Sequence, residues 1–180
     1  MKPKKCRVCQ AEYTPARMGQ KVCSPGCAIQ DVQKTKRREY RKETRALKEQ
    51  VKNRSQWMKE AQQAFNAYIR ARDAHLPCIS CERHHQGQYH AGHYRSAGGN
   101  PELRFEELNT HKQCMPCNSH LSGNLINYRI NLIKKIGLGA VEWLEGPHEP
   151  KKYTIENLKE IRDKYRKMEK DEKKHNQVLT

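Results

Sequence analysis

Eight cysteines fall into four close pairs along this chain of 180 residues. The pairs are Cys6/Cys9, Cys23/Cys27, Cys78/Cys81 and Cys114/Cys117. A close pair on a tight turn presents two thiolates, which is half of a tetrahedral zinc site, so two pairs complete one site. The spacing therefore predicts two structural Zn²⁺ ions, one held by the first two pairs and one by the last two.

Disulfide bonds are the alternative use of such pairs, and they belong mainly to secreted proteins. The N-terminus offers no apolar segment that could serve as a secretory signal, because Met1 is followed by Lys2, Lys4 and Lys5. We therefore expect the cysteines to be reduced and to bind metal.

Histidines gather around the second set of cysteines. Six of the nine lie there: His84, His85, His90, His93, His111 and His120. Four cysteines already saturate one zinc ion, so these histidines are available to bind a second metal or to act as bases.

The order of residues in this region resembles the zinc-bound branch of the His-Asn-His endonucleases. The pattern consists of Cys78-x2-Cys81, His90-Ala-Gly-His93-Tyr94, Asn109, and Cys114-Met-Pro-Cys117-Asn118-Ser-His120. The resemblance implies a small ββα-metal core, or His-Me finger, in which a hairpin and a helix hold one catalytic Mg²⁺ or Mn²⁺. It also implies that the two cysteine pairs pin the ends of this core.

The same resemblance assigns roles to three residues. His93 stands at the position of the general base, and Asn109 at that of the asparagine that braces the hairpin loop. Asn118 stands at the position of the last metal ligand. Phage junction-resolving enzymes of the endonuclease VII type share this pairing of cysteine and asparagine.

One position departs from the family pattern. The residue before the base is often an aspartate that binds the catalytic metal, and here it is Gly92. His90 and His120 are the natural substitutes. Positions 90 and 93 of a strand face opposite sides, so a bulge near Gly92 would be needed to bring both to one site. If His90 is only a surface residue, Asn118, His120 and DNA phosphate would hold the metal.

The composition favours a nucleic-acid partner. The formal charge is +16, and only 35% of the residues are hydrophobic. Polyanions bind such chains strongly because neutralised phosphates release counterions, although a merely solvated basic surface is the alternative. No apolar run approaches the roughly 20 residues of a membrane span.

The chain divides into four expected segments, and the fold class is α+β, mostly helical. They are an N-terminal zinc module with four cysteine ligands (1–30), a basic helical arm (31–76), a zinc-bound nuclease core (77–137) and a C-terminal helical segment (138–180). Residues 28 to about 75 form one long helix or a helical pair. Its first half is a basic arm that is expected either to lie on DNA or to pair with another subunit. The alternative is an exposed charged helix without a partner. The expected DNA contacts there are Lys36, Arg37, Arg38, Arg41, Lys42 and Arg45.

Apolar spacing predicts which elements pack. Trp57 and Trp143 are expected in the core, and Thr154 is expected to cap a last helix that frays from Lys170 onward. Pro25 and Gly26 are expected to break regular structure. The helix of the motif should pack through Leu121, Leu125, Tyr128, Leu132 and Ile136.

Over essentially its full length the chain resembles the NinG, or Rap, family of lambdoid phages. The resemblance implies a recombination endonuclease that hydrolyses phosphodiesters in Holliday junctions and D-loops, in the cytoplasm of a bacterial host. Arg83 or Arg95 would grip the scissile phosphate. Symmetric cutting would call for a homodimer, but no clean heptad seam marks an interface. The alternatives are a zinc-stabilised DNA-binding mediator without cleavage and a sequence-specific nuclease of the same class.

Overall fold

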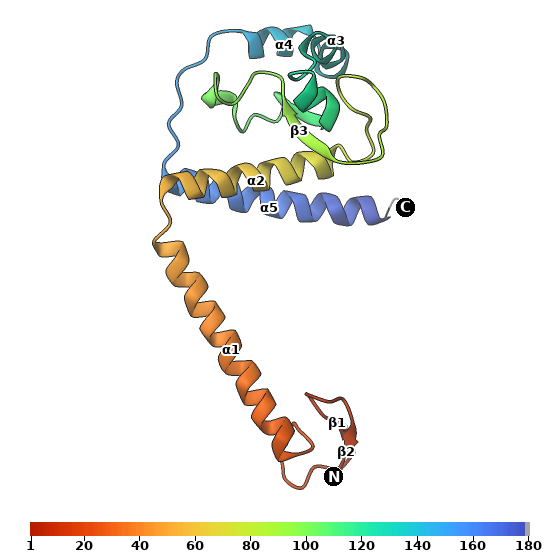
Figure 1. Cartoon of the computed structure of the whole chain (residues 1–180), viewed down its shortest axis with the longest axis vertical. Coiled ribbons are helices and arrows are strands. Elements are labelled where there is room, and N and C mark those ends of the chain that lie inside the picture. The colour runs from red at the N-terminus through yellow and green to blue at the C-terminus, as the bar shows by residue number, and fades with distance from the viewer. Residues whose placement is uncertain (179–180) are drawn as a thin grey trace. The chain divides into compact units, whose positions relative to one another are not determined.

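A computed structural model of the protein describes residues 1–178 and shows two compact units, Met1–Lys52 and a second unit that begins at Asn53. Within the described residues the secondary structure is mostly helical, with two small two-stranded sheets (Figure 1). The mostly helical α+β class is therefore confirmed. The division between the units lies inside the segment 31–76 that the sequence suggests as a single arm.

The first unit consists of a short hairpin and a long helix. Strands β1 (Lys4–Lys5) and β2 (Glu12–Tyr13) pair antiparallel, and α1 spans Pro25–Gln50. The expectation that Pro25 breaks regular structure is wrong. The Ser24 hydroxyl caps the helix by accepting a hydrogen bond from the Cys27 N–H at 3.2 Å, and Pro25 fits the first turn, where its missing N–H has no helical partner.

The expected helical stretch is a pair of helices, because a new helix starts directly after α1. Helix α2 spans Arg54–Arg72. The Asn53 side chain accepts from the Gln56 N–H at 3.0 Å, and the Gln56 side chain accepts from the Asn53 N–H at 2.9 Å. This reciprocal capping box satisfies two backbone donors that a helix start otherwise leaves without partners.

Helix α2 packs alongside α5 (Ile155–Val178), as Figure 1 shows. Their shared core includes Trp57, Phe65, Leu158 and Tyr165, all at most 4% exposed. The core position of Trp57 and the packing of this second half of the stretch are therefore confirmed. Asn157 N–H donates to the Thr154 hydroxyl at 3.2 Å, which confirms the cap of the last helix.

The C-terminal helix does not fray where expected. Helix α5 continues unbroken past Lys170 to Val178. Asn176 Nδ2 donates to the Ala71 carbonyl at 2.9 Å and ties the last turns to the end of α2. The expected frayed tail also includes residues 179–180, which lie outside the described residues.

The second sheet is the hairpin that carries most of the candidate site. Strand β3 (Tyr89–His93) pairs antiparallel with β4 (Thr110–Cys114), in a continuous register from Tyr89↔Cys114 to His93↔Thr110. Helix α2 packs near Ala91 of β3. Helices α3 (Leu125–Ile136) and α4 (Leu138–Glu145) form a separate core that includes Tyr128. Two short turns complete the unit, η1 (Pro101–Leu103) and η2 (Pro116–His120).

The expected packing face of α3 is only partly correct. Tyr128 and Leu132 are fully buried, and Ile136 packs at the edge of their cluster. Leu121 and Leu125, however, are 58% and 48% exposed. The helical spacing does not extend back to Leu121, because residues 122–124 all have positive φ and the helix starts only after them.

Trp143 is a second correction, since it is 49% exposed rather than in the core. Helix α4 buries Val141 and Leu144 instead. The indole lies on the outer side, where its ring meets His148 edge-on at a centroid distance of 4.8 Å.

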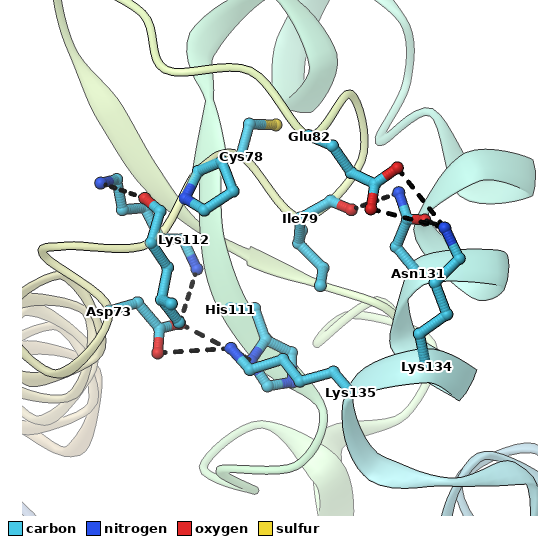
Figure 2. A pocket seen from close by; sticks show the side chains of 11 residues that line it. Asp73, Cys78, Ile79, Glu82, His111, Lys112, Asn131, Lys134 and Lys135 are labelled. Atoms are coloured by element: carbon cyan, nitrogen blue, oxygen red, sulfur yellow. Dashed lines mark hydrogen bonds and ion pairs between the residues drawn. The ribbon is translucent and has the colours of Figure 1, made fainter.

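A buried carboxylate joins α2, β4 and α3 beside the pocket in Figure 2. The Asp73 side chain is 3% exposed and lies 2.9 Å from Arg72 Nη2 and 3.4 Å from Lys135 Nζ. It also accepts the Lys112 backbone N–H at 3.0 Å. Burial alone would raise the pKa of Asp73, but hydrogen bonds from Arg72 and the positive charges of Arg72 and Lys135 hold it far below its usual range.

His111 belongs to this structural cluster. Its Nδ1 lies 3.0 Å from both Arg72 Nη2 and Lys135 Nζ, and its Nε2 lies 3.1 Å from the Leu108 carbonyl. Two cationic donors at Nδ1 require a lone pair there, so the proton is on Nε2. Burial lowers the pKa of His111, which keeps the ring neutral.

Asp73→Asn is expected to destabilise the protein by about 2–4 kcal/mol, because Arg72 and Lys135 then lose the buried charge that compensates them. The loss should be present above about pH 5 and should shrink below the unfolded carboxyl pKa of about 3.9, since the depressed pKa makes the ionised form the stabilising one. Urea unfolding followed by circular dichroism measures it. Asp163→Asn is the control, because that carboxylate is 62% exposed and paired only with Arg162 among the described residues. Equal, small losses in both variants would contradict a central role for Asp73.

Candidate metal and nucleic-acid site

The first cysteine cluster has the dimensions of a zinc site. Cys9 Sγ lies 3.5 Å from Cys23 Sγ, which lies 3.7 Å from Cys27 Sγ. A tetrahedron with Zn–S bonds near 2.3 Å has edges of about 3.8 Å, whereas a disulfide would bring two sulfurs to about 2.05 Å. Burial would raise the pKa of Cys6, but backbone amides that face its sulfur lower it to about 6 and favour the thiolate.

The second cluster pins the two ends of the β3–β4 hairpin. Its four sulfurs lie within 4.8 Å of one another, and Cys81 Sγ lies 3.9 Å from Cys114 Sγ. The Cys114 N–H donates to Cys78 Sγ at 3.3 Å, and His85 Nε2 lies 3.1 Å from Cys81 Sγ. All eight cysteines are free, so each cluster can hold one zinc ion.

Asn109 ties together the loop between β3 and β4. It is fully buried, its Oδ1 accepts the Arg95 N–H at 2.7 Å, and its Nδ2 donates to the carbonyls of Arg95 (2.9 Å) and Leu103 (3.1 Å). Its own carbonyl accepts the Tyr94 N–H at 2.8 Å. These bonds hold the chain on both sides of Arg104 in one conformation.

His93 is oriented by this loop. Its Nε2 lies 2.9 Å from the Arg104 carbonyl, and its ring centroid lies 6.1 Å from that of Phe65. A carbonyl can only accept, so Nε2 carries the proton and Nδ1 keeps its lone pair. Burial lowers the pKa of His93 below its ordinary value of about 6.5, and the Arg104 carbonyl opposes this only in part. The ring is therefore neutral at physiological pH.

His90 and Asn118 come together beside this strand. His90 Nδ1 lies 2.9 Å from the Asn118 side-chain amide. The nitrogen and oxygen of that amide exchange places by a simple flip, so an oxygen can face the same point as the imidazole lone pair.

The strand carries His90 and His93 on opposite faces, because its register contains no bulge. The bulge that would bring both to one face is absent from β3. Strand β3 pairs with β4 on one side only, so its other edge is free. One groove is bordered by His90 and Asn118, and a second of about 570 Å³ by His93, Arg95 and Asn118. Asn118 thus connects the two grooves.

Of the other residues predicted for the site, one borders a groove and two do not. His120 is exposed and borders neither groove. Arg83 is exposed, and its carbonyl accepts the Cys78 N–H at 3.0 Å. Arg95, in contrast, borders the groove with His93, and its buried Nε has no partner among residues 1–178.

The structure adds Gln113, which the sequence did not suggest. A Cβ at Gly92 would overlap the Gln113 side chain, whose Nε2 donates to Ser80 Oγ and to the Gly123 carbonyl, both at 2.6 Å. An aspartate at position 92 would therefore require the Gln113 side chain to move and would disturb these two hydrogen bonds. Gln113 could be found only with the strand register known, which pairs it with His90 on the face shared with Gly92.

The basic residues of α1 are available to a partner. Six of them are exposed and form no ion pair within residues 1–178: Lys36, Arg37, Arg38, Arg41, Lys42 and Arg45. In the same range of residues, no helix combines the length and apolar character needed to span a membrane.

Two zinc ions per chain are expected to copurify with the protein. Cys6→Ser should lose one ion and leave the second unit folded, whereas Cys114→Ser should lose the other ion together with the hairpin, because zinc binding is part of its folding free energy. Elemental analysis and near-UV circular dichroism measure both effects. Zinc-free protein, or wild-type protein with disulfides, would contradict both sites.

Comparisons with known proteins agree with the resemblance seen in the sequence. The family described as "Bacteriophage Lambda NinG protein" matches residues 1–176. The protein ninG of Escherichia phage lambda is 43% identical over 181 residues, covering 91% of this chain and 89% of the relative. Protein ninG of Escherichia phage 933W is 41% identical over 186 residues, covering 93% and 92%. No solved structure gives a significant match. The chain belongs to the NinG family of lambdoid phages.

Proposed function

We propose that this protein is a metal-dependent endonuclease that cleaves branched DNA intermediates of phage recombination, such as Holliday junctions and D-loops. The observation that carries the proposal is His93, a neutral imidazole with an anchored Nε2 that borders one groove together with Asn118 and Arg95. In this reading the hairpin β3–β4 and the residues after it form a ββα-metal core. The preference for branched DNA rests on the family resemblance.

The reaction begins with proton transfer to His93. Nδ1 accepts a proton from a water molecule aligned with a backbone phosphorus, while the Arg104 carbonyl keeps Nε2 protonated and the ring in position. Asn109 acts as a positioning residue, because it holds the loop that supplies this carbonyl. The new P–O bond forms as the bond to the 3′-oxygen breaks, and a proton from solvent goes to that oxygen, which leaves a 5′-phosphate and a 3′-hydroxyl.

His90 and Asn118 would hold the catalytic metal ion. Their 2.9 Å separation fits two neighbouring ligands on an octahedral ion, which lie about 3 Å apart when the metal–ligand bonds are near 2.1 Å. A bound Mg²⁺ or Mn²⁺ supplies charge stabilisation at the phosphate and the leaving oxygen. Two protein ligands leave the other positions to water and phosphate oxygens, as Mg²⁺ usually requires.

Arg95 is the residue that would bind the scissile phosphate. Arg95 borders the groove of His93, and its buried Nε–H has no partner in the described chain. Its positive charge would attract a phosphate that enters the groove, and a shift of the side chain would let the guanidinium donate charge-assisted hydrogen bonds to it. The exposed basic residues of α1 supply further, salt-dependent attraction for DNA.

His93→Ala is expected to slow cleavage of a synthetic four-way junction by about 10²–10⁴-fold, the usual contribution of a general base. Junction affinity should stay the same, because the imidazole contacts no phosphate in this scheme. The assay compares a junction with a matched duplex in Mg²⁺ and in Mn²⁺, and His84→Ala, an exposed histidine of the same unit, is the matched control.

Unchanged cleavage by His93→Ala would refute the assignment of the base. Wild-type protein that binds junctions but never cuts them would favour the non-catalytic DNA-binding mediator. Cleavage of one linear sequence as fast as the junction would favour the sequence-specific nuclease.

The cleavage rate should depend on pH through His93. A base works in its neutral form, so the rate should rise with pH, and the midpoint of the rise should lie below the ordinary imidazole pKa of about 6.5. The expectation follows from the lowered pKa of this buried ring. Single-turnover rates between about pH 5 and 8 measure the profile. A midpoint above about pH 6.5 would contradict a buried His93 with a lowered pKa.

A further inference from the structure

Helix α1 carries an apolar stripe that its own unit leaves exposed. No residue of α1 is buried, and five apolar side chains at the helix or its C-cap are 54–81% exposed: Ile29, Val32, Tyr40, Leu47 and Val51. At about 100° per residue, all five lie within an arc of roughly 100° around the helix. Lys36 and Glu43 fall within the same arc. Exposed apolar residues aligned on one face in this way mark an interaction surface.

The basic residues occupy the other side of the helix. Lys34, Arg37, Arg38, Arg41, Lys42, Arg45 and Lys48 are centred roughly 140° from the apolar stripe. The stripe itself has one positive and one negative side chain, so it carries no net charge. DNA phosphates would therefore be attracted to the basic side, which leaves the stripe for a different partner.

The stripe is complementary to itself when it is reversed. From either end it reads apolar, apolar, charged, tyrosine, charged, apolar, apolar, and the charges have opposite signs. A two-fold axis near Tyr40 would place Ile29 opposite Val51, and Val32 opposite Leu47 to within one residue, or about 1.5 Å along the helix. The same axis would place Lys36 opposite Glu43 and Tyr40 opposite its own equivalent.

We propose that α1 pairs antiparallel with α1 of a second copy of this chain through this stripe. An interface of this kind is isologous, with the same patch used by both copies, as in most homodimers. A parallel pair would instead place Lys36 against Lys36 and Glu43 against Glu43, which is repulsive. The apolar stripe therefore favours an antiparallel pair of helices over a parallel coiled coil.

Neither charge of the stripe has an ion-pair partner within the described residues. Lys36 and Glu43 are seven residues apart, or about 10.5 Å along the helix axis, which is too far for an ion pair on one helix. Neither residue forms an ion pair within residues 1–178. A second copy supplies both missing partners at once, in two symmetric pairs.

The dimer combines two functions on one helix. The stripes face each other, and the basic sides of both helices remain outside for DNA. The two copies of Lys52, where the first unit ends, lie at opposite ends of the helical pair. The inference does not depend on DNA cleavage and would hold for a pure binding protein.

Charge reversal in the full-length protein tests the pairing. Wild-type protein should be dimeric in sedimentation equilibrium. Lys36→Glu and Glu43→Lys should each weaken dimerisation at least about 10-fold, because each creates two repulsive pairs. The double variant K36E/E43K should dimerise again, and an equimolar mixture of the two single variants should form the heterodimer. Arg38→Glu, on the basic side, is the control and should leave dimerisation unchanged.

Three results would overturn the proposal. The first is a wild-type protein that stays monomeric at about 100 µM. The stripe would then have to pack against another part of the same chain. The second is a dimer that the single reversals do not weaken. The third is a failure of both the double variant and the mixture to dimerise while circular dichroism shows α1 intact.

Discussion

The candidate site depends on the clamp formed by Cys78, Cys81, Cys114 and Cys117. A two-stranded hairpin is at best marginally stable in water, and here β3 and β4 pair over only five residues each. The cysteine cluster joins the turn before β3 to the end of β4 and to η2, which carries Asn118. A zinc ion bound by this cluster would therefore stabilise the hairpin and fix where Asn118 lies relative to His90.

The rest of the support for the site is polar. Asn109 holds the loop through its side-chain amide, Asp73 joins three elements through a buried carboxylate, and Gln113 links the hairpin to the loop before α3. A chain with only 35% hydrophobic residues has too little apolar surface to fix a loop by packing alone. Directional hydrogen bonds between buried groups specify one geometry and are costly to break singly. Such hydrogen bonds are therefore well suited to hold His93 in one position.

The predictable parts were those governed by local spacing. Cysteine pairs indicated two metal clusters, and apolar periodicity indicated the packed faces of α2 and α5, including Trp57 and the cap at Thr154. Exposure of Leu121, Leu125 and Trp143 was not predictable in the same way, because it depends on where α3 and α4 begin and which neighbours they meet. The start of α3 follows a loop of positive φ angles that apolar spacing does not reveal.

Residues that connect distant parts of the fold were harder still to predict from the sequence. Asp73 and His111 are 38 positions apart in the sequence, and the role of each is visible only when α2, β4 and α3 are assembled. For the site itself, the order of histidines and asparagines suggested His90, His93, Asn109 and Asn118. The sequence also suggested His120 as a metal ligand, and only the structure shows that it borders neither groove.

The contact between Gly92 and Gln113 links this geometry to the proposed chemistry. Because Gln113 fills the space over Gly92, the edge of β3 offers a metal two neutral donors, His90 and Asn118, and no carboxylate from position 92. A site without that negative charge repels a DNA phosphate less than a carboxylate-rich one, and the phosphate oxygens then provide the anionic ligands that a hard cation prefers. The absence of aspartate at this position is thus compatible with the proposed hydrolysis, and in that proposal the DNA itself would be part of the metal site.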